Sequence, residues 1–78
     1  MTPEELRIVG ELRKLAASGA ARSARKAQHI GLRELARTIG TSPSTVSRWE
    51  NGLTAPRGDA ALKWAHVLGM ASTAERAA

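Results

Sequence analysis

The sequence contains no cysteine, so neither disulfide bonds nor thiolate-bound zinc can stabilise its fold. Phenylalanine and tyrosine are also absent, and two tryptophans are the only aromatic residues. No apolar run approaches the roughly 18 residues that cross a bilayer. Glu4 and Glu5 stand where a signal peptide would carry positive charge. These absences predict a small cytoplasmic protein of 78 residues, without a membrane span, whose stability depends on apolar packing.

Residue types that perform catalysis or bind metals are too sparse to build such a site. The two histidines, His29 and His66, have no cysteine and no paired carboxylates at a spacing that suits a metal or an acid–base pair. We therefore expect a protein that is not an enzyme, with no catalytic residue, no metal site, no cofactor and no small-molecule ligand.

Positive charge is in excess, because 12 basic residues face 7 acidic ones and the formal charge is +5. On a small domain such a surplus favours an anionic partner, which could be nucleic acid, a membrane surface or an acidic protein. Glu34 is the only acid among the cations that crowd one third of the chain, namely Arg22, Arg25, Lys26, Arg33 and Arg37. Taken alone, such a cluster could equally be a solvated polar face.

The N-terminal third of the chain has the pattern of amphipathic helices. Thr2, Pro3 and Glu5 suit the N-cap, the first helical position and the capping box. The helix over residues 3–17 would bury one stripe, made of Ile8, Val9, Leu12, Leu15 and Ala16. An alanine-rich helix follows over residues 20–28, and its apolar side would comprise Ala20, Ala24 and Ala27. The sequence leaves open whether residues 3–28 form one helix or two.

Capping residues predict two short helices in the middle of the chain, over residues 32–39 and 43–50. Gly31 can cap the first, and Gly40 can end it in the left-handed region. Ser42 is a good N-cap for the second. The expected buried residues of the two helices are Leu35, Ala36, Ile39, Val46 and Trp49.

Asp59 can begin a last helix, which Gly69 closes. Its core side would comprise Ala61, Leu62, Ala65 and Leu68, with Trp64 close to that side. We therefore predict an all-α fold, a compact bundle of about five short helices that contains a helix-turn-helix. The predicted division is an N-terminal amphipathic helix at residues 1–18, a helix-turn-helix domain at 19–70 and a short C-terminal tail at 71–78.

The stretch ELARTIGTSPSTVSRWENG, residues 34–52, has two short helices joined by a turn of about three residues, as in a helix-turn-helix. At about 100 degrees per residue, Val46 and Trp49 fall on one side of the second helix and Ser44, Ser47 and Arg48 on the other. Small hydroxyl side chains allow close approach to a groove, and an arginine can contact guanine through two hydrogen bonds. Double-stranded DNA is therefore the expected partner.

This stretch and the following APRGDAALKWAHVLGM resemble the lambda-repressor-like family, the Cro and phage-repressor type of helix-turn-helix, over about residues 20–70. The resemblance implies that helix 43–50 enters the major groove. The implied base-facing residues are Pro43, Ser44, Ser47 and Arg48. The expected phosphate contacts are Arg22, Arg25, Arg33, Arg37, Ser42, Thr45 and Asn51. Leu32 and Gly58 depart from the family pattern, which often has glutamine at the first position and an apolar residue at the second.

The family resemblance suggests a transcriptional regulator, such as a phage- or plasmid-type repressor or a Cro-like switch. An antitoxin-type regulator fits as well. A different class is a protein-interaction adaptor that docks a partner through its N-terminal helix. A homodimer is possible, and the apolar stripe at residues 8–16 could form part of a two-fold contact or pack entirely within the chain. A membrane-surface helix is disfavoured, because the first helix has balanced charge and no aromatic anchor.

Overall fold

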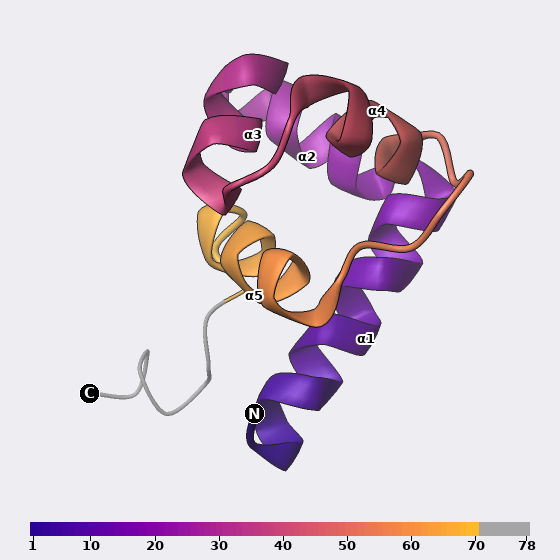
Figure 1. Ribbon diagram of the computed structural model, residues 1–78, viewed down its shortest axis with the longest axis vertical. Helices are drawn as coiled ribbons and strands as arrows, with labels where there is room; N and C mark the ends of the chain where they lie inside the picture. The colour runs from indigo at the N-terminus through magenta and orange to yellow at the C-terminus, as the bar shows by residue number, and fades with distance from the viewer. Residues whose placement is uncertain (71–78) are drawn as a thin grey trace.

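Five α-helices follow one another in the computed structural model, which describes residues 1–70 (Figure 1). They are α1 (Pro3–Ser18), α2 (Ala20–Ala27), α3 (Leu32–Ile39), α4 (Pro43–Glu50) and α5 (Gly58–Val67). No strand occurs among residues 1–70. The all-α prediction is therefore confirmed. The predicted tail at 71–78 lies outside the described residues.

The start of α1 is fixed by the predicted capping box. The Thr2 N–H donates to Glu5 Oε1 at 2.8 Å, and the Glu5 N–H donates to Thr2 Oγ1 at 3.1 Å. The first of these bonds holds the pKa of the Glu5 carboxyl below its ordinary value, because the backbone N–H stabilises the charged form. Pro3 then occupies the first turn, where its missing N–H costs no helical hydrogen bond.

Residues 3–28 form two helices rather than one, because Gly19 adopts a left-handed conformation with φ of 88°. The face that α2 buries carries Ala21 and Arg25. The predicted apolar side was therefore wrong, since Ala20 and Ala27 are exposed and Ala24 is only half-buried. The turn at Gly19 sets the rotation of α2 about its own axis, and alanine spacing carries no information about that rotation.

All five helices share one hydrophobic core, and α1 packs against α2, α4 and α5. From α1 the core takes Val9, Leu12 and Ala16, all buried, while Ile8 and Leu15 pack at its edge. The apolar stripe of α1 is thus covered mainly by the chain itself. This arrangement supports the intramolecular alternative for residues 8–16.

The two tryptophans are both buried in this core, as their helical spacing predicts, and their rings also stack on each other. Trp64 is fully buried and Trp49 is 4% exposed, and their ring centroids lie 6.3 Å apart with 30° between the planes. On α5, Ala60, Ala61 and Ala65 are buried beside Trp64. Leu62 and Leu68, which we expected in the core, lie half-buried at its edge. The bulk of the core on α5 therefore comes from one indole ring surrounded by alanines.

Gly10 lies inside α1, where a Cβ atom would meet nothing within 4 Å. Replacing Gly10 with alanine should stabilise the protein by about 0.5–1 kcal/mol, because alanine loses less backbone entropy in a helix. Chemical denaturation of both proteins measures the difference. Gly40→Ala is the matched control, since its Cβ is equally unobstructed but the residue has φ of 78°. That variant should be destabilised, and a loss of stability in both variants would contradict the prediction.

Candidate nucleic-acid interface

A tight turn at Gly40 sets the angle between α3 and α4. Gly40 ends α3 in the left-handed conformation, and the Thr41 N–H donates to the Ala36 carbonyl at 2.9 Å. Ser42 then caps α4, because its Oγ accepts the Thr45 N–H at 3.3 Å. Ala36 is buried, and its small side chain lets the two helices approach closely. The predicted sequence of helix, glycine turn and capped helix is present.

The two sides of α4 differ as the sequence predicts. Val46 and Trp49 are buried, whereas Ser44 and Arg48 are exposed and Ser47 is half-buried. Arg48 forms no ion pair among residues 1–70. The structure therefore brings Ser44, Ser47 and Arg48 together on the solvent side of one helix.

The polar atoms around this face are held by short local hydrogen bonds. Ser42 Oγ lies 2.8 Å from Thr45 Oγ1 and 3.3 Å from Ser44 Oγ. At the other end of α4, Asn51 Nδ2 donates to Ser47 Oγ at 3.4 Å. Pro43 is half-buried at the first helical position and carries no N–H. The N-terminal turn of α4 thus offers hydroxyl groups, rather than charged side chains, to a ligand.

A buried ion pair joins the C-terminal end of α4 to α2. Arg25 Nε donates to Glu50 Oε2 at 2.7 Å, and Arg25 Nη2 donates to Glu50 Oε1 at 3.0 Å. A third bond runs from Arg25 Nη1 to the Ile30 carbonyl at 2.8 Å. The two residues are only 7% and 6% exposed. Their bidentate geometry fixes the position of α4 on the rest of the domain.

This ion pair corrects one predicted site residue and adds one that was missed. Arg25 cannot serve as a phosphate contact, because its guanidinium is buried and occupied by Glu50 and the Ile30 carbonyl. A count of cations along the chain says nothing about their depth. Glu50 was not predicted as buried. The burial of Arg25 could have been inferred from its spacing, because it lies four residues after Ala21 and therefore on the same face of α2. Ala21 is small and apolar, which suits a buried face.

The other three predicted arginines are exposed, and two of them line a cleft beside α4. Arg33 and Arg37 of α3 line a cleft together with Ala36, Thr41 and Pro43, next to the first turn of α4. Arg22 is exposed on α2 and does not line this cleft. The predicted basic cluster is therefore divided among three environments. They are a buried ion pair at Arg25, a cleft with Arg33 and Arg37, and two exposed cations one turn apart on α2, Arg22 and Lys26.

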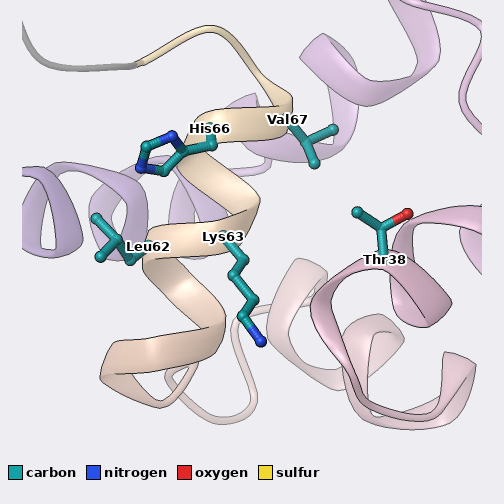
Figure 2. Close-up of a pocket in the computed structure, with 5 residues that line it drawn as sticks. All are labelled: Thr38, Leu62, Lys63, His66 and Val67. Carbon is teal, nitrogen blue, oxygen red and sulfur yellow. The ribbon is translucent and has the colours of Figure 1, made fainter.

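A second hollow lies between α5 and the C-terminal end of α3. It is lined by Thr38, Leu62, Lys63, His66 and Val67, and Figure 2 shows Thr38 facing α5 across it. His66 has no companion ligands, since no three histidine, cysteine or acidic side chains gather anywhere in residues 1–70. Over the same residues, no helix has both the length and the apolar character to cross a bilayer.

A family model described as helix-turn-helix matches residues 22–75, which is more than half of the chain. The match includes α3, the turn at Gly40 and α4. Searches of curated proteins and of solved structures found no match.

Proposed function

Because this chain belongs to the lambda-repressor-like helix-turn-helix family, we propose that it binds double-stranded DNA in a sequence-specific way and regulates transcription. One observation carries the proposal: α4 buries Val46 and Trp49 and leaves in solvent a face of small hydroxyl residues and Arg48, which has no ion-pair partner within residues 1–70. A helix of this kind can enter the major groove with its N-terminal end leading.

In this proposal Ser44, Ser47 and Arg48 face the bases, with Pro43 at the leading edge. Phosphate contacts come from the exposed cations and from polar groups at the ends of α4, namely Arg22, Arg33, Arg37, Ser42, Thr45 and Asn51. Arg25 is left out because Glu50 holds it inside the domain. Selection of bound sequences from a random duplex pool tests the function. A protein that enriches no sequence and shows no salt-sensitive binding would contradict it.

Within the family a repressor or Cro-like switch, of phage or plasmid type, is the role that we propose. The protein would then act in the cytoplasm. We also propose that it binds symmetric half-sites as a homodimer, because one recognition helix reads only a few base pairs. Val9 and Leu12 are already buried within the chain, so a contact between copies can use only the half-buried edge of the stripe, Ile8 and Leu15, or residues elsewhere. The same burial weighs against an adaptor that docks a partner through that stripe.

Arg48 should contribute to sequence discrimination rather than to general affinity. Arg48→Ala should weaken binding to the selected duplex by about 1–3 kcal/mol, because a bidentate contact to guanine is lost. Binding to random duplex should weaken much less. Fluorescence anisotropy on both duplexes measures the two losses.

Arg7→Ala provides the control, because it removes the same charge from an exposed position on α1. It should weaken specific and random binding by the same small amount. If Arg48→Ala behaves like Arg7→Ala, Arg48 makes no base contact.

A further inference from the structure

The cleft between α3 and the start of α4 combines features that suit an anion. Arg33 and Arg37 lie one turn apart on the same side of α3, at a spacing that puts their Cβ atoms about 5–6 Å from each other. Both side chains are exposed, and neither forms an ion pair among the described residues. Two like charges at this spacing destabilise a helix when nothing neutralises them.

The nearest acid in sequence does not neutralise these arginines, because it is used elsewhere. Glu34 Oε1 accepts the Gly31 N–H at 2.8 Å in the capping box of α3. Its carboxylate therefore stabilises the first turn of its own helix. No acidic side chain among residues 1–70 neutralises the positive charge of Arg33 and Arg37, so that charge is available to an anion that binds the protein.

The remaining walls of the cleft determine what kind of anion fits. Thr41 is half-buried, and its hydroxyl makes no hydrogen bond within residues 1–70, so it is free to donate. Pro43 has no N–H, and Ala36 contributes only a methyl group. The side-chain donors that line the cleft are therefore two guanidinium groups and one hydroxyl. Planar guanidinium groups match the oxygens of a phosphate and can hold them through paired hydrogen bonds.

We propose that this cleft holds a single phosphate of the DNA backbone, shared by Arg33 and Arg37 with Thr41 as a third donor. The inference rests on the proposed function, since it places the phosphate beside the end of α4 that leads into the groove. It adds the number of phosphates contacted, since both arginines bind the same phosphate. Pro43 belongs both to the cleft and to the first turn of α4. A phosphate held in the cleft would therefore fix the position of α4 relative to the DNA backbone.

The salt dependence of binding tests the number of phosphates. Each phosphate that a protein neutralises contributes about 0.9 to the slope of log affinity against log salt concentration. The double variant Arg33→Ala/Arg37→Ala should therefore lower the slope by about 1 per bound protomer, which is about 2 for a dimer on both half-sites. Two separate contacts would lower it by about 2 per protomer, and no contact would leave it unchanged; either result overturns the inference.

A scan of the DNA backbone tests the position of the phosphate. The probe is the selected duplex carrying one neutral methylphosphonate at a time. A methylphosphonate at one position in each half-site should weaken binding of the wild-type protein by a factor of about 10, because it removes a charge-assisted contact. The same methylphosphonate should not affect the double variant, which already lacks that contact. Arg22→Ala is the matched control, and it should keep the sensitivity at that position.

The outcomes separate the inference from the function on which it rests. A protein that binds the selected duplex but shows no such position, or that loses the sensitivity equally in Arg22→Ala, overturns the shared phosphate and leaves DNA binding intact. A protein that selects no duplex overturns both. Circular dichroism of the double variant confirms that the exposed substitutions leave the fold unchanged.

Discussion

Replacing Glu50 with alanine should destabilise the protein by about 3–5 kcal/mol, because it leaves the buried Arg25 guanidinium without its carboxylate. At roughly 0.05–0.15 kcal/mol per residue, a chain of this length has a total stability of roughly 4–12 kcal/mol. The loss therefore amounts to at least about a quarter of the total stability. Urea denaturation followed by far-ultraviolet circular dichroism measures the loss.

Two control variants separate the buried pair from a general charge effect. Glu11→Ala removes a carboxylate from an exposed pair with Lys14 at 3.5 Å, and it should cost no more than about 0.5 kcal/mol. Arg25→Met/Glu50→Leu removes both buried charges and should recover most of the lost stability, since no unpaired charge is left. A cost for Glu50→Ala no larger than that of Glu11→Ala would show that the buried pair contributes little.

Trp64→Ala should cost about 3–5 kcal/mol, because it opens a cavity in a core that otherwise consists largely of small residues. Trp64 is fully buried on α5 and stacks against Trp49 of α4. Loss of the ring thus also removes one of the contacts that support the buried side of α4. Denaturation must again be followed by circular dichroism, since the substitution itself changes the tryptophan fluorescence.

Trp64→Phe is the informative companion of this variant. The Trp64 indole N–H is buried and has no hydrogen-bond partner within the described residues, so the phenylalanine variant also removes a cost of desolvation. It should therefore be much less destabilised than Trp64→Ala, despite its smaller ring. Equal losses in the two variants would indicate that the indole N–H is satisfied in solution and that the full volume of the ring is required.

Local signals in the sequence were sufficient to predict most of the helix boundaries. Thr2 and Ser42 cap helices where their side-chain oxygens accept backbone N–H groups, and Gly40 ends a helix in a conformation that few other residues adopt. The solvent face of α4 was predictable for a similar reason. Its eight residues contain only two large apolar side chains, Val46 and Trp49, and these define the buried side.

Features that depend on tertiary packing could not be predicted in this way. Arg25 and Glu50 are 25 residues apart, and their pairing depends on the rotation of α2 that the turn at Gly19 imposes. The apolar stripe of α1 was equally suited to a partner or to the chain itself, because periodicity shows that a face is buried but not what covers it. The cleft at Arg33 and Arg37 exists only where α3 and α4 meet.

The packing of α1 against α5 has a consequence for the order in which the protein folds. These are the first and the last described helices, so the core closes only when segments about fifty residues apart in sequence come together. During synthesis α4 leaves the ribosome before α5, at a stage when Trp49 lacks its stacking partner. We therefore expect the stacking contact of α4 to form last, and a nascent chain that stops before Trp64 to leave Trp49 without the ring that covers it.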